Sequence, residues 1–317
     1  MTFSITIPAY KSQFLREAIE SIVRQTYSDW QLIIVDDCSP ENLGAVVKPY
    51  LDDPRISYYR NQQNCGAVNV VDNWNICLSH ATGDYVICMG DDDRLLPCCL
   101  EEYRRLIERH PGLNVYHGWT QIIDEMGQLS YLQAPRPEWE SVLSLIWNRW
   151  NGRRFQFIGD FCYLTSYLKA NGGYQHFPLA WGSDDVTAVL AARDKGIANT
   201  QTFCFQYRHN SQSITSTAFA GEKIEALIAQ HKWYTDFINA IVPDSLSEPD
   251  ASYYKTLWTA GKRHFKSIDR NCIDAFRGNP FKVLHWRKRL SCFGFPSIYY
   301  WKWYVASVLN LFLKKKI

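Results

Sequence analysis

The sequence predicts an α/β fold, with a mostly parallel sheet flanked by helices and a helical C-terminal region. In the first hundred residues, short apolar runs alternate with segments whose apolar residues recur at helical spacing. Such alternation of strands and helices produces a parallel sheet covered on both faces. After about residue 220 the strand-like runs stop and the helical spacing continues. We therefore expect a first unit at residues 1–219, with halves at 1–110 and 111–219, and a helical unit at 220–317.

Each expected strand is a short run rich in β-branched or aromatic residues. The run at 31–35 is almost wholly apolar, which is typical of a parallel strand buried on both faces. In chain order, we expect strands at residues 3–7, 31–35, 56–60, 85–89, 114–123 and 202–207.

The expected helices repeat their apolar residues every three or four positions. In the segment 14–25, for example, Leu15, Ile19 and Ile22 recur at this spacing. We expect further helices at 43–51, 69–80, 100–109, 186–195, 223–242 and 252–268. The stretch 134–157 contains prolines and several arginines, and we expect a loop with one short helix there.

Composition narrows the class of protein. The chain has 34 Lys and Arg against 32 Asp and Glu, a net charge of +2, which gives no support to nucleic-acid binding. Its ten cysteines include no Cys-x-x-Cys pair, and no basic and apolar leader precedes the first expected strand. We therefore expect buried free thiols in a cytoplasmic protein. No run of 18 uninterrupted apolar residues is present, so no membrane-spanning helix is expected.

Two acidic groups follow expected strands, at the edge where parallel sheets bind ligands. Asp91, Asp92 and Asp93 repel one another unless a cation compensates them, and a hard divalent cation does so. The alternative is a solvated acidic turn before a helix, but the position after a buried strand favours a metal. Asp36 and Asp37 suit hydrogen bonds to a nucleobase or ribose as well as they suit a helix N-cap.

Two later features are further candidates. Asp184 and Asp185 stand at the entry of an expected helix, either as dipole-stabilising caps or with one of them as a general base. His209 follows the expected strand at 202–207. A lone histidine is more often structural, but beside a carboxylate-bound metal an imidazole serves as a further ligand.

These candidates lie within short motifs that follow one another over about residues 1–215. The motifs are Ile5-Thr6-Ile7-Pro8-Ala9-Tyr10, Ile34-Val35-Asp36-Asp37-Cys38-Ser39, Asn64-Cys65-Gly66, Ala81-Thr82-Gly83-Asp84-Tyr85, Gly90-Asp91-Asp92-Asp93 with Leu96-Pro97, Gly172-Gly173-Tyr174, Trp181-Gly182-Ser183-Asp184-Asp185 and Arg208-His209. In this order and spacing they resemble glycosyltransferase family 2.

The resemblance implies a GT-A fold and an inverting, Mg²⁺- or Mn²⁺-dependent transfer from a nucleoside-diphosphate sugar, most often UDP-linked, to a glycan or lipid-linked saccharide. The family's donor-binding residues fall on Pro8, Ala9, Tyr10, Asp36, Asp37, Asn64, Gly66, Asp91 and Asp92. Its metal site falls on Asp91, Asp92 and Asp93, with His209 near the metal or diphosphate. Its catalytic base falls on Asp185, with Asp184 orienting the site or capping the helix.

The sequence departs from the family pattern at two places. The family's usual first Asp of Asp-x-Asp-Asp falls on Gly90, so a metal contact has to come from Asp91, Asp92 or Asp93. After Gly66, where the family often has an Arg-Asn pair, the sequence reads Ala67-Val68-Asn69-Val70-Val71-Asp72-Asn73.

Other functions fit the sequence less well. A nicotinamide dehydrogenase needs a glycine-rich turn after its first strand, where Pro8-Ala9-Tyr10-Lys11 stands instead. A nucleotidyltransferase would want a glycine-rich and basic phosphate loop near the start, and none is visible. A non-catalytic carbohydrate-binding or peripheral membrane protein on the same fold is the remaining alternative, but it has no need for both acidic groups.

The C-terminal residues predict a helix with a membrane-facing character. On a helix from Ser297, Lys302, Ala306 and Asn310 form one narrow polar stripe, and apolar residues fill much of the rest. Trp and Tyr residues lie at one end, and a lysine cluster at 314–316 lies at the other. This arrangement is typical of a helix at an anionic membrane interface, here the inner face, where it would suit a membrane-bound acceptor. The alternative is a final helix packed on the protein.

Overall fold

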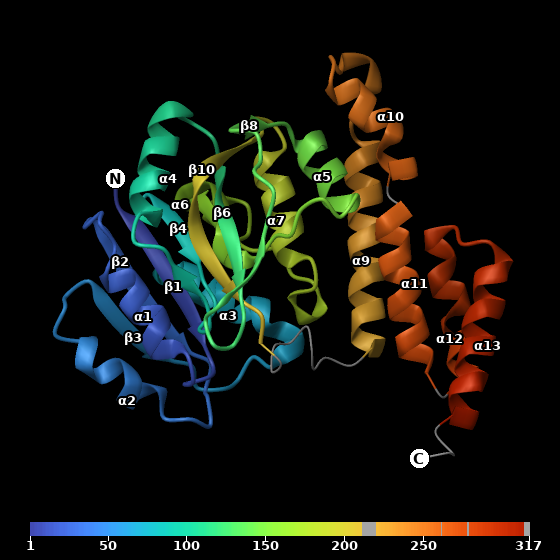
Figure 1. Cartoon of the computed structure of the whole chain (residues 1–317), viewed down its shortest axis with the longest axis horizontal. Helices are drawn as coiled ribbons and strands as arrows, with labels where there is room; N and C mark the ends of the chain where they lie inside the picture. Colours follow the sequence, from blue (N-terminus) through green and yellow to red (C-terminus); the bar gives the residue numbers. More distant parts are fainter. Residues whose placement is uncertain (211–219, 261, 278, 314–317) are drawn as a thin grey trace.

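A ten-stranded sheet runs through the first two thirds of the chain in a computed structural model that describes residues 1–210, 220–260, 262–277 and 279–313 (Figure 1). Its long strands are β1 (Phe3–Ala9), β2 (Trp30–Asp36), β3 (Ile56–Arg60), β4 (Tyr85–Cys88), β6 (Val115–Ile123) and β10 (Ile197–Arg208). The pairs β1–β2, β1–β4, β2–β3 and β6–β10 are parallel, as the alternation of strands and helices predicts. The predicted α/β class is therefore confirmed.

Four short strands were not expected from the sequence. They are β5 (Arg94–Leu95), β7 (Leu129–Leu132), β8 (Trp139–Glu140) and β9 (Phe161–Leu164), and every one pairs antiparallel. Strand β9 joins β4 to β6, so that the main path of the sheet reads β3-β2-β1-β4-β9-β6-β10-β5. These additions connect the two halves of the first unit in one sheet.

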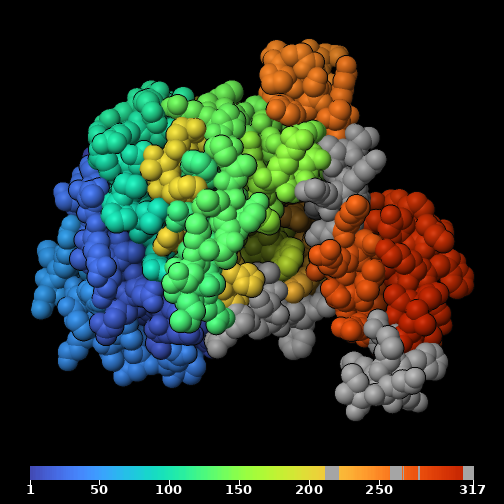
Figure 2. All heavy atoms as spheres, in the orientation of Figure 1, coloured from blue at the N-terminus to red at the C-terminus, as the bar shows by residue number. Residues whose placement is uncertain are grey.

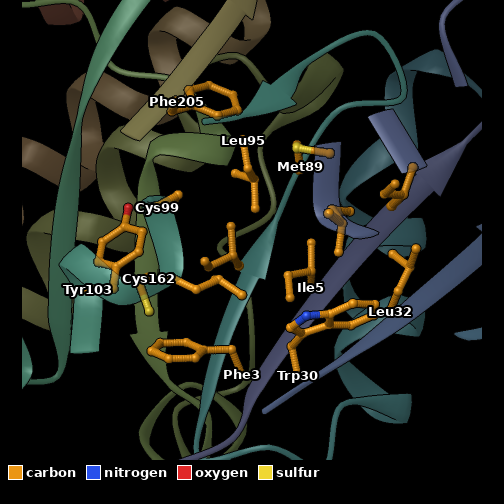
Figure 3. Packing of buried hydrophobic residues seen from close by; sticks show 14 of the residues in the cluster. Phe3, Ile5, Trp30, Leu32, Met89, Leu95, Cys99, Tyr103, Cys162 and Phe205 are labelled. Carbon is orange, nitrogen blue, oxygen red and sulfur yellow. The ribbon is translucent and has the colours of Figure 1, made fainter. Parts of the chain in front are cut away.

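Helices cover both faces of this sheet, and each face has its own core. Along β2, Leu32 and Ile34 lie in the first core, whereas Ile33 and Val35 lie in the second, because successive strand residues point to opposite faces. The first core includes Phe3, Ile5 and Trp30 (Figure 3). It is covered by α1 (Leu15–Val23), α2 (Leu43–Val47) and α4 (Cys99–Arg109). The second is covered by α3 (Val70–His80), α5 (Val142–Trp150), α6 (Thr165–Ala170) and α7 (Ser183–Ala192).

The C-terminal region is helical, as expected. It contains α9 (Ala220–Asn239), α10 (Asp250–Ala260), α11 (Lys262–Phe276), α12 (Phe281–Leu290) and α13 (Ser297–Leu313). The single helix expected at 252–268 is wrong, because α10 ends and α11 begins inside that range. In Figure 1, α11 lies between α9 and α13, so the helices extend away from the sheet as successive layers.

Helix α9 packs on the sheet and on the outer helices at once. Its residues Tyr234 and Ile238 belong to the second core, which Leu257 of α10 also joins. Its residues Ile224 and Leu227 belong to a separate group that we call the outer cluster. The outer cluster also contains Ile268, Cys272, Phe276, Leu290 and Trp303 from α11, α12 and α13. The boundary at 219/220 remains a prediction, and hydrophobic packing continues across it.

Three further sequence-based expectations concern the cysteines, membrane-spanning helices and the last helix. All ten cysteines are free thiols, as expected, but only six are buried, and Cys292 is exposed. No helix in the described part of the chain is long and apolar enough to cross a membrane. In the expected polar stripe of the last helix, Lys302 is exposed and Ala306 is half-buried. The Asn310 side chain and the lysines at 314–316 lie outside what the structure describes.

Candidate active site

The carboxyl ends of β1, β2 and β4 bring most of the expected donor-binding residues to one edge of the sheet. The turn after β1 is bound to Asp91–Asp93, which we call the acidic cluster, because the backbone N–H groups of Tyr10 and Lys11 both donate to Asp91 Oδ2 at 2.7 Å. The same strand is tied to β2, where the Asp37 N–H donates to the Ala9 carbonyl at 2.9 Å. Tyr10 is exposed at this edge, whereas the neighbouring Ala9 is buried.

Asp36 is fully buried and already has several partners. Its carboxylate accepts hydrogen bonds from the Ser39 N–H at 2.7 Å and the Tyr58 hydroxyl at 2.6 Å, and it forms an ion pair with Arg60. Burial and this hydrogen bond to Asp36 raise the pKa of Tyr58 to about 12. The geometry therefore gives Asp36 the task of holding β2, β3 and the turn between Asp36 and Ser39 together.

Asp37 instead holds the loop that contains the Asn64-Cys65-Gly66 motif. Its carboxylate accepts from Asn61 Nδ2 at 2.9 Å and from the Cys65 N–H at 3.0 Å. Its carbonyl accepts from Asn64 Nδ2 at 2.7 Å. Gly66 has a φ of +77°, a backbone conformation that favours glycine. Asp37 thus positions an exposed Asn64 and a glycine turn beside the end of β2.

The three consecutive aspartates after β4 have different surroundings. Asp91 binds the turn after β1, and Asp93, which is 3% exposed, accepts from the Arg208 N–H at 2.9 Å. Asp92 accepts from Asn210 Nδ2 at 3.4 Å, and no closer hydrogen bond to its carboxylate is present among the described residues. Burial, followed by the Asp92 charge, raises the pKa of Asp91 to about 6 and that of Asp93 well above its ordinary value.

Gly90 permits the close packing of these carboxylates. A Cβ on Gly90 would lie 2.8 Å from Asp93 Oδ2 and 2.9 Å from Asp92 Oδ1. The aspartate that the family pattern has at this position would therefore displace its neighbours. Glycine at this position, in place of the family's aspartate, leaves room for the Asp92 and Asp93 carboxylates to lie close together.

Arg208, at the end of β10, supplies the buried positive charge beneath the acidic cluster. It is 1% exposed, and its Nε donates to the Asp92 carbonyl at 2.8 Å. Its Nη2 donates to Glu17 at 2.7 Å, and its guanidinium lies 4.1 Å from the centre of the Phe14 ring. This side chain therefore connects α1, the acidic cluster and β10.

The acidic cluster offers carboxylate oxygens, which are the ligands that a divalent cation takes when a diphosphate supplies its other ligands. No group of three or more His, Cys, Asp or Glu within the described residues is arranged to hold a metal by itself. Mg²⁺, however, commonly takes one or two protein carboxylates and the oxygens of a phosphate. Asp92 offers a partly exposed carboxylate for this purpose. His209 is exposed, and its N–H donates to the Ile123 carbonyl at 2.8 Å. The metal roles of Asp91, Asp92, Asp93 and His209 remain predictions.

The second acidic pair opens helix α7. Asp185 is 7% exposed, and both of its carboxylate oxygens accept from Arg149 Nε, at 2.9 and 3.0 Å. Asp184 accepts the Asp185 N–H at 2.8 Å. Burial, followed by the Asp185 charge, raises the pKa of Asp184 well above its ordinary value. The pair thus combines a charge-compensated Asp185 with an Asp184 that favours its protonated form.

Helix α9, in the C-terminal region, packs against the loop before this pair and against α5. Gly182, just before α7, has a φ of +81°, and a Cβ on it would lie 1.8 Å from Gln230 Nε2. The Lys223 ammonium lies 5.1 Å from the centre of the Trp181 ring. Tyr234 is buried with its ring centre 5.2 Å from that of Trp150. Residues from the C-terminal region therefore form part of the wall around Asp184 and Asp185.

Tyr207, on β10, is influenced by the charges of both acidic groups. Its pKa is raised by burial and by the charges of Asp93, Asp92 and Asp184, so it is close enough to sense carboxylates of both groups. Its ring stacks on Phe157 with 3.7 Å between centres. A space-filling view shows the molecule hollowed between the green segment before α5 and the orange helix α11, with olive atoms of the region around α7 on its floor (Figure 2).

Sequence reasoning missed Arg149, Asp160 and the roles of Tyr207 and Arg208. Asp160 is fully buried, accepts from Thr120 Oγ1 at 3.0 Å, and has a pKa that burial raises to about 7. The sequence did contain a signal for Arg208. Three adjacent carboxylates need a cation, and Arg208 directly precedes His209, which is itself a candidate metal ligand. No sequence signal pointed to Arg149, which lies 36 residues before its partner.

Comparison with known proteins matches these observations. The profile of the family described as Glycosyl transferase family 2 matches residues 4–168. A putative glycosyltransferase, EpsE, of Bacillus subtilis is 36% identical over 115 residues, which cover 36% of this chain and 40% of that protein. The chain thus spans well under two thirds of the length of this relative.

Two further similarities extend over more of the chain. An Escherichia coli protein named UDP-Glc:alpha-D-GlcNAc-diphosphoundecaprenol beta-1,3-glucosyltransferase WfgD is 23% identical over 219 residues, covering 68% of this chain and 80% of that protein. The crystal structure of S. aureus TarS 1-349 in complex with UDP-GlcNAc has a TM-score of 0.70 at 16% identity, covering 98% of this chain and 89% of that one. The predicted GT-A fold is confirmed, and the chain belongs to glycosyl transferase family 2, a family of glycosyltransferases.

Proposed function

We propose that this protein transfers a sugar from a UDP-sugar to a hydroxyl group of a lipid-linked saccharide or related glycan, with inversion and with the help of a divalent cation. The observation that carries the proposal is the presence of two acidic groups: Asp91–Asp93 at the donor edge of the sheet, bound to the turn after β1, and Asp184 with Asp185 at the start of α7, where Arg149 holds Asp185. Family membership supports the reaction class. The names of the WfgD and TarS proteins support a UDP-linked donor, and the name of WfgD supports an undecaprenol-linked acceptor.

The donor would lie along the carboxyl ends of β1, β2 and β4. Pro8, Ala9 and Tyr10 would line the base pocket, with Asn64 and Gly66 on the loop that Asp37 holds. Asp36 would act indirectly by fixing this edge, because its carboxylate is buried and occupied. Asp92 would face the diphosphate together with the cation, while Asp91 and Asp93 hold the surrounding backbone.

The chemistry asks two things of the protein. The bond between sugar and phosphate breaks as positive charge develops on the anomeric carbon and negative charge develops on the diphosphate, so groups that stabilise these charges lower the barrier. When bound, a divalent cation at Asp92 neutralises charge on the diphosphate. A carboxylate on the acceptor side takes the proton of the attacking hydroxyl, which contributes about 10²–10⁴-fold to the rate.

Asp185 is the better candidate for this base. A base has to be ionised before it accepts a proton, and Arg149 supplies Asp185 with a compensating positive charge at hydrogen-bond distance. Asp184 favours its protonated form, so it is poorly suited to accept a proton near neutral pH. We assign Asp184 the role of fixing the first turn of α7 through its bond to the Asp185 N–H.

The proposed reaction is tested by incubating the protein with a panel of UDP-sugars and measuring UDP release with Mn²⁺, with Mg²⁺ and with a chelator. We expect one donor to be hydrolysed slowly in the absence of an acceptor, and we expect the chelator to stop this. GDP- and CDP-sugars serve as controls for the base. UDP release that persists unchanged in the chelator would refute the role of the cation.

Replacing Asp185 by Asn should separate the two halves of the proposal. Because the base acts on the acceptor, we expect donor affinity to stay within about twofold while transfer falls by about 10²-fold or more. Asp184→Asn is the matched control, and we expect a smaller loss. Calorimetric titration of the donor and a transfer assay measure the two effects. The opposite ranking of the two variants would move the base to Asp184.

A further inference from the structure

Apart from Lys302, the outer face of helix α13 is apolar where an ordinary surface helix is polar. Ile298, Trp301, Val305 and Leu309 recur along one side of the helix and are 51–68% exposed. The side that packs on the protein carries the fully buried Trp303 and the buried Ser307. An exposed apolar face of this kind favours a partner, because burying it removes apolar side chains from water.

Helix α12 also exposes apolar side chains, and it adds positive charge. Its residues Phe281 and Leu284 are 74% and 61% exposed. A cavity of about 470 Å³ lies between α12 and α13 and is lined by Leu284, Arg287, Lys288, Ser291, Phe295 and Tyr300. Arg287 and Lys288 form no ion pair with an acidic side chain among the described residues, and the Arg287 guanidinium lies 5.8 Å from the centre of the Tyr300 ring.

Positive charge is concentrated in the C-terminal part of the sequence. Residues 262–317 carry 13 Lys and Arg against two Asp, a formal charge of +11. Residues 1–261 carry 21 Lys and Arg against 30 Asp and Glu, a formal charge of −9. The near-neutral net charge of the chain is therefore the sum of a strongly basic C-terminal region and an acidic region before it.

From these observations we propose that the outer surface of α12 and α13 docks on an anionic lipid bilayer. Ile298, Trp301, Val305 and Leu309 enter the headgroup region, and Arg287 and Lys288 contact lipid phosphates around the cavity beside Leu284. A bilayer fits better than a protein partner, because tryptophan beside aliphatic side chains, among many cations and few acids, matches the interface between hydrocarbon and anionic headgroups. The proposal goes beyond the transfer reaction and does not depend on it.

The proposed binding to a bilayer can be tested by measuring how much of the full-length protein sediments with lipid vesicles. We expect binding to vesicles of phosphatidylcholine and phosphatidylglycerol at low salt, weaker binding at high salt, and little binding to phosphatidylcholine alone. The pair Arg287→Gln and Lys288→Gln should lower the partition coefficient about fivefold for each charge removed. The pair Trp301→Gln and Val305→Gln should lower it about tenfold or more.

Matched controls separate this surface from general charge and general hydrophobicity. Lys232→Gln with Lys255→Gln removes two exposed charges from α9 and α10, and Val242→Gln removes a side chain that is 64% exposed elsewhere. We expect these variants to bind vesicles as the unaltered protein does, and circular dichroism melts confirm that every variant is folded. Equal binding by all variants, or no sedimentation with anionic vesicles, would refute the proposal. It would be refuted equally by a dimer in ultracentrifugation that only the α13 substitutions dissociate, because the face would then be a contact between copies of this chain.

Discussion

The three aspartates after β4 show how neighbouring residues of one type acquire separate tasks. Asp91 accepts two backbone N–H groups from the turn after β1, and Asp93 accepts one from β10. Both carboxylates thereby satisfy backbone donors that would otherwise lack a partner at this edge. Asp92, whose carboxylate accepts only one long side-chain hydrogen bond among the described residues, is the least engaged of the three.

Alanine substitutions should therefore have different effects at the three positions. We expect Asp91→Ala and Asp93→Ala to lower the free energy of unfolding by about 1–3 kcal/mol, because each leaves backbone N–H groups unpaired. We expect Asp92→Ala to change stability little and to raise the Mn²⁺ concentration for half-maximal activity by about tenfold or more. Urea titration and activity against metal concentration measure these quantities. A stable Asp91→Ala with a lost metal response would exchange the two assignments.

The buried carboxyl group of Asp160 should make the stability of the protein depend on pH. Its pKa is raised from an ordinary 3.8 to about 7, so between these values the folded protein holds a proton that the unfolded chain releases. The folded state is therefore favoured at low pH, and this contribution is lost as the pH rises from about 4 to about 7. From pH 5 to pH 8 the loss amounts to about 3 kcal/mol.

The variant Asp160→Asn should remove this dependence. An amide cannot ionise but can still accept a hydrogen bond from Thr120 or from the Phe157 N–H. We expect the variant to be more stable than the unaltered protein at pH 8, with a smaller difference at pH 5. Urea midpoints at both pH values test this expectation. Parallel stability profiles for the two proteins would mean that Asp160 stays ionised throughout the range.

At the scale of elements, helix α9 is coupled to the loop that opens α7. Gly182 adopts a left-handed backbone conformation and allows the Gln230 side chain to lie directly against it. The next turn of α9 brings Tyr234 into the second core beside Trp150 of α5. A shift of α9 would therefore be transmitted to the start of α7, where Asp184 and Asp185 are fixed.

This coupling can be measured with Gly182→Ala. The left-handed conformation costs a residue with a Cβ about 1–2 kcal/mol, and the contact with Gln230 adds to that cost. We expect a loss of about 2–3 kcal/mol in the free energy of unfolding and a lower kcat at unchanged donor affinity. In the double variant with Gln230→Ala, the contact is relieved, so the two losses should be less than additive. Strict additivity would show that Gln230 does not press on Gly182.

Elements with a strong periodic pattern were predictable from the sequence, and elements fixed by distant contacts were not. The long strands and the helices α1, α3 and α4 follow their hydrophobic spacing. Strands β5 and β8 have two residues each, so their pairing with β10 leaves no pattern to detect. In the site, the acidic residues were visible because they follow strands, but the Arg208 contact with Asp93 joins residues 115 apart.

At the scale of the whole molecule, hydrophobic packing continues from the sheet into the C-terminal helices. Tyr234 and Ile238 of α9 and Leu257 of α10 are buried in the second core together with residues of α3, α5 and α7. Helices α11, α12 and α13 add the outer cluster on the far side of α9. Helix α9 is thus the only described element that contributes buried residues to both groups, which makes it the structural link between the catalytic unit and the proposed membrane surface.

Two truncations distinguish this arrangement from a simple appendage. Removing residues 220–317 withdraws Tyr234, Ile238 and Leu257 from the second core. At about 1.5–3 kcal/mol for each large buried side chain, the loss is comparable with the whole stability of a typical domain, 5–15 kcal/mol. We therefore expect the fragment 1–219 to show no cooperative unfolding. The fragment 1–260 keeps these residues and loses the outer cluster, so we expect a cooperative transition at lower urea, retained donor binding, and no binding to anionic vesicles. If 1–219 unfolds cooperatively and binds the donor as well as the full chain does, the sheet is independent of α9 and the boundary at 219/220 divides two separate units.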